Sequence, residues 1–480
     1  MIAFVISRIL LTEAVLLALP VIIALLYGES PVPFLLAAAA LGILGLALGT
    51  RRPQRTSLYA RDGFAVVALA WLLMSAFGAL PFVLSGDIPN AVDAFFETVS
   101  GFTTTGATIL TDVEAMSQSG LMWRSFTHWV GGMGVLVFVM AILPMTDGHG
   151  MHLMRAEVPG PTSGKLVSRM GDTAKILYGI YFVLTLLEIV MLLLGGMSPF
   201  DALIHAFGTA GTGGFSNRGL SVGAYNSAYL EIVIGVFMLL FGINFNLYYF
   251  LLIRKFRDVF RSEELRTYLA IVALSVGAIT VNIARLYDSV FTALRHAFFQ
   301  VSTIITTTGY ATTDFNLWPS FSKSVLVLLM FIGGCAGSTG GGLKVGRVII
   351  LVKASLSDMK KMLHPNAVST VRFEGRPLAD QTVRSAYQYI TVYLGLLILS
   401  CLLLSLDGFD LISTVTAVIA CFNNIGPGLE LVGPMGNFAA FSYPGKLLLS
   451  FDMLAGRLEL FPMLLLFAPS IWRRRISWGK

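Results

Sequence analysis

The chain has 480 residues, of which 56% are hydrophobic and only 12% charged, and its formal net charge is +6. Soluble domains carry roughly 25% charged residues, whereas here the apolar residues form blocks of about 20, the length that crosses a bilayer core of about 30 Å. This pattern excludes a soluble enzyme, a secreted disulfide-stabilised domain and a disordered protein. It predicts an all-α polytopic membrane protein.

Ten apolar segments are expected to cross the membrane. In chain order they lie at 5–27, 33–50, 63–85, 121–145, 174–197, 228–253, 267–287, 322–352, 385–406 and 446–470. The first contains Arg8, then an apolar run to Leu26, and has no small-residue cleavage site, so we interpret it as a retained helix rather than a signal peptide. Ten crossings place the two termini on the same side.

The positive charge is concentrated in a few short loops. These basic loops lie at 51–61, 155–175, 254–266, 353–384 and 473–480, while the loops between them carry few cations. Short loops rich in Lys and Arg stay in the cytoplasm, so we expect both termini there and no nucleic-acid partner. The three cysteines have irregular spacing, which predicts neither a metal site nor a disulfide.

Four half-apolar stretches lie between the longer segments. They are 91–104, 199–211, 293–307 and 411–423. Each is too short to cross a bilayer, so we expect re-entrant helices. A Gly/Thr-rich segment follows each of them.

The short stretches belong to an internal repeat. Ala-Phe-Phe-Glu at 94–97 leads to Thr-Thr-Thr-Gly at 103–106, and Ala-Phe-Phe-Gln at 297–300 leads to Thr-Thr-Thr-Gly at 306–309. Four span–short helix–span copies predict a pseudo-fourfold arrangement around a central axis. The expected units are an N-terminal helix pair and four repeats, at 1–50, 63–145, 174–253, 267–352 and 385–470.

The segments after the short helices are expected to bind an ion. Irregular backbone at membrane depth is tolerated only when it is buried in protein or lines a water-filled path. Potassium channels use four Gly-containing loops whose carbonyl oxygens replace the hydration shell of the ion. No ring of four carboxylates or four cations accompanies the glycines here, which favours backbone oxygens and a dehydrated monovalent cation. The expected ion-binding residues are Thr104, Thr105, Gly106, Thr212, Gly213, Thr307, Thr308, Gly309, Asn424, Ile425 and Gly426.

A glycine-rich loop, residues 333–342, interrupts the apolar segment 322–352. It has six glycines among ten residues, too many for a stable helix because each Gly costs roughly 1 kcal/mol relative to Ala. We interpret it as a movable loop that obstructs the path from below, with a bend for close helix packing as the alternative. The expected gating residues are Gly333, Gly334, Gly337, Ser338, Thr339, Gly340, Gly341 and Gly342.

Arg457 lies in the middle of the last apolar segment, where charged residues are functional candidates. As a gating residue it would repel a passing cation or hold the glycine-rich loop through the loop's backbone carbonyls. The alternative is an ion pair with Asp452 or Glu459 that only joins helices.

Four carboxylates occur near the starts of the short helices: Asp93, Glu97, Asp201 and Asp410. They would attract cations at the mouth of a path or cap helix N-termini. For Asp93, Asp201 and Asp410 we favour capping.

These features together resemble the TrkH/TrkG/KtrB superfamily of potassium-uptake membrane proteins. The resemblance rests on Thr-Thr-Thr-Gly-Ala-Thr at 103–108, Thr-Thr-Thr-Gly-Tyr-Ala at 306–311, Gly-Ser-Thr-Gly-Gly-Gly at 337–342 and Ala-Gly-Arg at 455–457. The helix pair at 5–50 is similar to the TrkH/TrkG branch.

The resemblance implies a selectivity filter with glycines at Gly106, Gly213, Gly309 and Gly426, an intramembrane gating loop at 333–342 and a pore-facing Arg457. It also implies a homodimer in a lipid bilayer, the bacterial inner membrane, with cytosolic nucleotide-binding subunits of the TrkA kind as regulatory partners. Potassium is the only ligand expected, and no organic cofactor. In related plant transporters a Ser at the first filter position accompanies sodium permeation, so Gly106 favours potassium.

Two other functional classes compete with a gated pore. A sodium- or proton-coupled potassium symporter would use broken helices and alternating access, but such proteins are commonly built from inverted repeats, whereas these repeats share one orientation. A membrane enzyme has no support, because no metal motif or nucleophile–base pair is present in the apolar segments.

Overall fold

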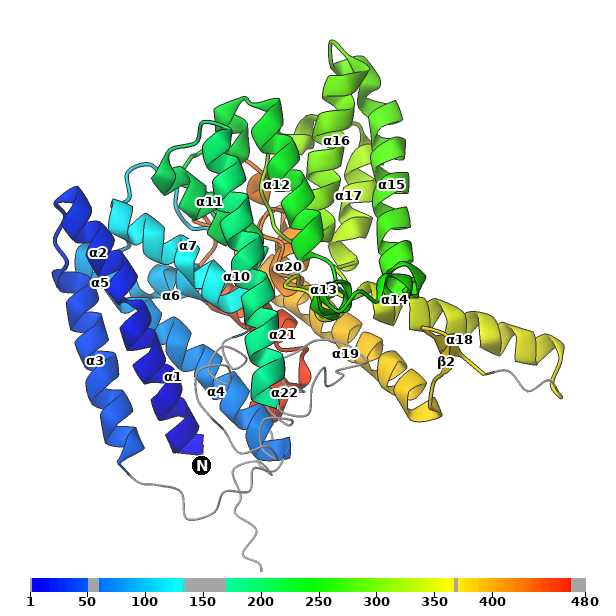
Figure 1. Cartoon of the computed structure of the whole chain (residues 1–480), viewed down its shortest axis with the longest axis horizontal. Coiled ribbons are helices and arrows are strands. Elements are labelled where there is room, and N and C mark those ends of the chain that lie inside the picture. Colours follow the sequence, from blue (N-terminus) through cyan, green and yellow to red (C-terminus); the bar gives the residue numbers. More distant parts are fainter. Residues whose placement is uncertain (1, 51–59, 133, 135–169, 367–369, 468–480) are drawn as a thin grey trace, which may run out of the picture.

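The computed structural model describes residues 2–50, 60–132, 134, 170–366 and 370–467 (Figure 1). Within these ranges the regular secondary structure is helical apart from one small hairpin. The α-helices and strands are α1 (Ile2–Leu16), α2 (Ala18–Tyr27), α3 (Val32–Gly49), α4 (Ala60–Gly78), α5 (Leu80–Ser85), α6 (Ala91–Phe102), α7 (Gln118–Gly132), α10 (Met170–Leu194), α11 (Pro199–Gly211), α12 (Ala228–Phe241), α13 (Phe245–Leu252), α14 (Phe256–Arg261), α15 (Glu263–Ile283), α16 (Val290–Ile305), α17 (Ser320–Phe331), α18 (Val345–Leu363), β1 (Arg372–Phe373), β2 (Arg376–Pro377), α19 (Asp380–Leu404), α20 (Leu411–Phe422), α21 (Tyr443–Arg457) and α22 (Phe461–Leu466). Short 3-10 helices lie at Ser221–Tyr225, Ala284–Leu286, Phe315–Leu317, Ser405–Asp407 and Glu430–Val432.

Six helical stretches among the described residues are long and apolar enough to cross a membrane, and the bent pair α12–α13 would make a seventh. The six are Ile2–Tyr27, Val32–Gly49, Gly63–Ser85, Thr173–Leu194, Glu263–Leu286 and Asp380–Asp407. They confirm six of the ten expected segments. Of the segment expected at 121–145, residues 133 and 135–145 lie outside the described residues.

Three expected segments are not continuous helices. The segment at 228–253 bends by 91° between α12 and α13. The interruption expected within 322–352 is present, because α17 ends at Phe331 and α18 begins at Val345. The segment at 446–470 breaks after Arg457, where Glu459 and Leu460 adopt left-handed φ values of 57° and 64° that L side chains rarely take.

The four short helices expected from the repeat are α6, α11, α16 and α20, which lie inside the bundle. Each packs against a helix that follows the short helix of the preceding unit: α6 against α21, α11 against α7, α16 against α12 and α20 against α17. These contacts run from one unit to the next and return to the first. Figure 1 shows α1 and α3 at one edge of this assembly and α15 and α18 at the other.

The N-termini of the short helices correct two of the capping assignments. Asp410 is the N-cap of α20, and its carboxylate accepts a hydrogen bond from the Ser413 amide (2.9 Å). The caps of α6 and α11 are instead Asn90 and Ser198, so the assignments of Asp93 and Asp201 were wrong. Both carboxylates lie in the first helical turn, where their negative charge interacts favourably with the positive end of the helix dipole.

Candidate functional site

The same backbone conformation follows each short helix. In three units a Thr, and in the fourth an Asn, is left-handed, with φ between 55° and 59°. Two residues later a Gly is left-handed, with φ between 77° and 94°. The residue pairs are Thr104 and Gly106, Thr212 and Gly214, Thr307 and Gly309, and Asn424 and Gly426. A left-handed β-branched residue costs about 1–3 kcal/mol and persists only where its surroundings enforce it.

We call residues 104–106, 212–214, 307–309 and 424–426 the ring segments. Their conformation corrects the expected register in the second unit. Gly214, not Gly213, occupies the position of Gly106, and Gly213 corresponds to Thr105. In the first, third and fourth units the left-handed residues are at the positions expected from the repeat.

The ring segments contact one another in cyclic order. A Cβ atom added to a glycine of one segment would collide with a carbonyl oxygen of the next, which is why Gly is required there. The pairs are Gly106 with Gly213, Gly214 with Thr308, Gly309 with Ile425, and Gly426 with Thr105. The fourth segment thus returns to the first, so the four enclose one axis.

Side chains join the fourth ring segment to the first. The Asn424 amide donates to the Thr105 hydroxyl (2.9 Å) and to the Met453 carbonyl (2.9 Å). The side chains of Thr104, Thr105, Thr212, Thr307, Thr308 and Asn424 are all fully buried. The ring segments are therefore closely packed among buried polar side chains.

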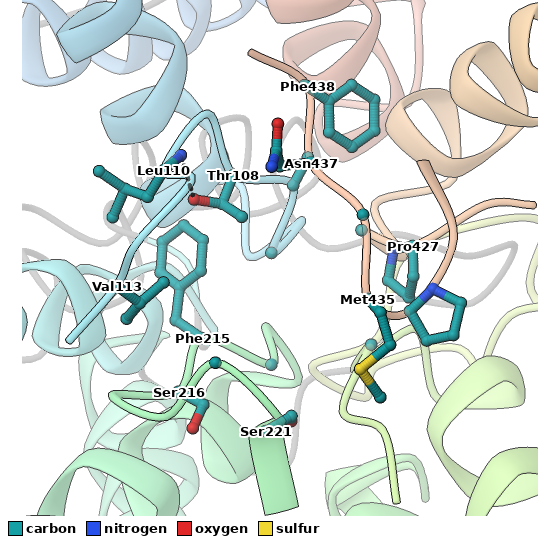
Figure 2. A pocket seen from close by; sticks show the side chains of 18 of the residues that line it. Thr108, Leu110, Val113, Phe215, Ser216, Ser221, Pro427, Met435, Asn437 and Phe438 are labelled. Atoms are coloured by element: carbon teal, nitrogen blue, oxygen red, sulfur yellow. Dashed lines mark hydrogen bonds between the residues drawn. The ribbon is translucent and has the colours of Figure 1, made fainter. Parts of the chain in front are cut away.

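A cavity of about 200 Å³ lies against one side of the ring. Gly106, Gly214, Gly309 and Gly426 all line it, whereas Gly213 does not. Figure 2 shows Thr108, Phe215 and Pro427, each one or two residues beyond a ring glycine, together with Met435, Asn437 and Phe438 around this cavity. The cavity therefore lies on the side of the ring toward which the chain runs after each ring glycine, and it gives access to the ring from that side.

A buried ion pair fixes the chain just beyond the ring. Glu97 accepts hydrogen bonds from Arg124 Nε (2.6 Å), the Thr108 hydroxyl (2.9 Å) and the Ile109 amide (2.9 Å). The Arg124 guanidinium lies 3.4 Å above the Phe215 ring centre. Because Phe215 follows Gly214 and Thr108 closely follows Gly106, the pair joins the first two ring segments. Glu97 is neither a cap nor a mouth residue, and the sequence pattern gave no sign of this role.

Removing one partner of this pair should be strongly destabilising. Glu97→Ala leaves the Arg124 charge buried without its carboxylate, which costs about 3–5 kcal/mol, so we expect a large fall in the melting temperature in detergent. Adding Arg124→Met should recover part of the loss, because the coupled pair is not additive. Asp358→Ala, in the half-exposed Lys361–Asp358 pair, is the control and should have little effect. Equal losses from Glu97→Ala and Asp358→Ala would contradict the assignment.

The glycine-rich loop lies directly against the ring. The Gly341 amide donates to the Thr307 hydroxyl (2.6 Å), and a Cβ atom on Gly341 would lie 2.6 Å from the Asn423 carbonyl oxygen. The Cys335 amide donates to the Gly242 carbonyl (2.9 Å), at the bend between α12 and α13. The loop therefore fills the space between the ring and the broken helices.

Arg457 joins this loop to two other elements. It donates to the carbonyls of Thr339 (2.7 Å), Gly131 (2.5 Å) and Gly132 (2.8 Å). The contact with the loop is therefore present, and the other two satisfy carbonyls at the C-terminal end of α7. The two carboxylates considered as alternative ion-pair partners of Arg457 contact other residues. Asp452 accepts from the Ser400 hydroxyl (2.7 Å), and Glu459 pairs with Arg347 (3.0 Å).

A ring of backbone carbonyls inside a helical membrane bundle, with a loop against it, is an arrangement suited to moving a cation. The chain belongs to the TrkH family, described as cation transport proteins, whose profile matches residues 34–474. It is thus an ion transporter and not an enzyme.

Individual relatives agree with this family. The potassium uptake protein TrkH of Salmonella typhimurium is 38% identical over 95% of both chains, and the potassium uptake protein TrkG of Escherichia coli is 35% identical over 95% of this chain and 94% of its own. The crystal structure of the potassium transporter TrkH from Vibrio parahaemolyticus is similar with a TM-score of 0.87 at 34% identity. That match covers 98% of this chain and 99% of the other.

Proposed function

We propose that this protein takes up potassium across the bacterial inner membrane, through a selectivity filter made by the ring segments. The observation that carries the proposal is the cyclic contact of the four segments, each glycine facing a carbonyl of the next. Relatives of similar length are named potassium uptake proteins, which supports potassium as the ion.

Backbone oxygens would coordinate the ion. Carbonyls at the ring would replace the hydration shell of potassium, and the left-handed residues turn the peptide groups so that this is possible. The proposed filter residues are Thr104, Thr105, Gly106, Thr212, Gly213, Gly214, Thr307, Thr308, Gly309, Asn424, Ile425 and Gly426. Pro427 follows the fourth glycine, so that quarter of the filter differs most from the others.

The glycine-rich loop would be the gate. It contacts the third and fourth ring segments through Gly341 and is held by Arg457, so ions could pass only after it moves. We also propose, from the family resemblance, that the chain forms a homodimer with cytoplasmic termini. Its cytosolic partners would be nucleotide-binding subunits of the TrkA type, which would move the loop.

Ion flux into proteoliposomes tests the function. We expect the purified chain to carry potassium down its own gradient, with sodium carried far more slowly, in the absence of any sodium or proton gradient. Potassium movement that occurs only with a sodium or proton gradient would favour a coupled symporter. Equal movement of potassium and sodium would contradict the filter.

A further inference from the structure

We propose that Glu264 is a positioning residue that holds the glycine-rich loop closed by binding one backbone amide within the loop and one just beyond it. Glu264 is buried at the start of α15. One carboxylate oxygen, Oε1, accepts hydrogen bonds from the amides of Ala336 (2.8 Å) and Gly346 (2.9 Å). The inference rests on the proposed gating role of the loop and adds the residue that controls it.

The two amides enclose the part of the loop that contacts the ring. Between them lie Thr339, which accepts from Arg457, and Gly341, which donates to Thr307. Hydrogen bonds to a carboxylate are roughly twice as strong as those between neutral groups. A single side chain therefore binds two backbone amides ten residues apart and limits the length of free chain between them.

The close approach depends on the residue at 346. A Cβ atom on Gly346 would lie 2.8 Å from Glu264 Oε1 and 3.2 Å from Phe373. Gly346 thus leaves room for both the carboxylate and the buried aromatic ring of the hairpin β1–β2.

The hairpin in turn fixes the backbone of Glu264. Glu374, in the turn between β1 and β2, accepts from the Ser262 hydroxyl (2.8 Å) and from the amides of Glu263 (3.1 Å) and Glu264 (3.0 Å). These contacts satisfy free amides at the N-terminus of α15. A continuous set of contacts therefore leads from an exposed turn, through Glu264, to the loop beneath the ring.

The chain carries its own reporter of loop release. Cys335 is fully buried inside the loop, and its amide is bonded to Gly242. With Cys401 and Cys421 replaced by alanine, the rate at which a water-soluble methanethiosulfonate reagent labels Cys335 measures how often the loop opens, independently of ion flux.

The test compares three variants in this background. Glu264→Ala removes the acceptor of both amides, so we expect labelling of Cys335 and basal potassium flux each to rise about tenfold, with the potassium-to-sodium ratio unchanged. Glu264→Gln keeps an acceptor oxygen but loses the charge, so both rates should rise less than in Glu264→Ala. Glu263→Gln, at the adjacent residue paired with Lys353, is the matched control and should change neither rate.

Each outcome decides a separate point. Unchanged labelling of Cys335 in a folded Glu264→Ala protein would overturn the positioning role. Labelling in Glu263→Gln that is as fast as in Glu264→Ala would overturn it too. Faster labelling with unchanged flux would support the positioning role and contradict the gate. If Glu264→Ala fails to fold, Glu374→Ala decides: a several-fold rise in labelling supports the proposal, and no rise overturns it.

Discussion

Replacing Gly106 with serine should lower the potassium-to-sodium permeability ratio about tenfold or more. A Cβ atom at this position collides with the Gly213 carbonyl oxygen, and φ is +80°. The substitution must therefore either displace an oxygen proposed to bind the ion or change the backbone that aims it. A change of about 1.4 kcal/mol in the free-energy difference between the two ions corresponds to a tenfold change in their permeability ratio. Relative permeability in bilayer recordings is the measurement.

Two matched substitutions sharpen this test. Ala107→Ser adds the same hydroxyl one residue beyond the ring glycine and should change the ratio much less. Gly214→Ser should act like Gly106→Ser, because its Cβ atom would collide with the Thr308 carbonyl oxygen. An unchanged ratio in Gly106→Ser would reject the filter, and an unchanged ratio in Gly214→Ser alone would reject the revised register.

Replacing Arg457 with alanine should raise basal potassium flux about tenfold or more. At an effective dielectric of about 20, a unit charge about 6 Å from the ion opposes its passage by roughly 3 kcal/mol. The arginine also donates to the loop at Thr339, so its removal would both lower the repulsion and free the loop. Flux into proteoliposomes measures the effect, with Arg285→Ala outside the ring and loop as the control.

Arg457→Lys separates the two roles. Lysine keeps the charge but cannot reproduce the several directed hydrogen bonds of a guanidinium. Flux that stays low in this variant indicates repulsion, whereas flux that rises indicates the contacts with Thr339 and α7. A folded Arg457→Ala protein that transports no faster than the parent would exclude both roles.

The short helices could be predicted within a few residues because their apolar pattern recurs in similar units along the chain. The register of the second unit was missed because Gly213 and Gly214 are adjacent. The sequence did contain a signal, since Ala202 lies 12 residues before Gly214, the same spacing as from Ala94 to Gly106 and from Ala297 to Gly309. The backbone conformation, with Gly214 at φ +77°, agrees with that spacing.

Of the residues that hold the loop, Arg457 could be proposed from the sequence, whereas Glu264 could not. Glu264 binds backbone amides 72 and 82 residues away, and a backbone amide leaves no trace in the side-chain pattern. The break after Arg457 has a partial signal in Pro462, at the start of α22, because a proline disfavours helix in the residue before it. The left-handed conformation of Glu459 and Leu460 has no such signal. Their strained conformation is maintained by tertiary contacts, including the Arg347–Glu459 pair and the full burial of Leu460.

The closure of the ring by four different segments of one chain has a consequence for how selectivity can evolve. In a channel made of four identical subunits, a single mutation alters all four sides of the coordination shell at once. In the filter proposed for this chain a mutation would alter one side, as the quarter with Asn424 and Ile425 in place of two threonines illustrates. Ion preference would then change one quarter at a time, and paired mutations on opposite sides of the ring would measure the coupling between them.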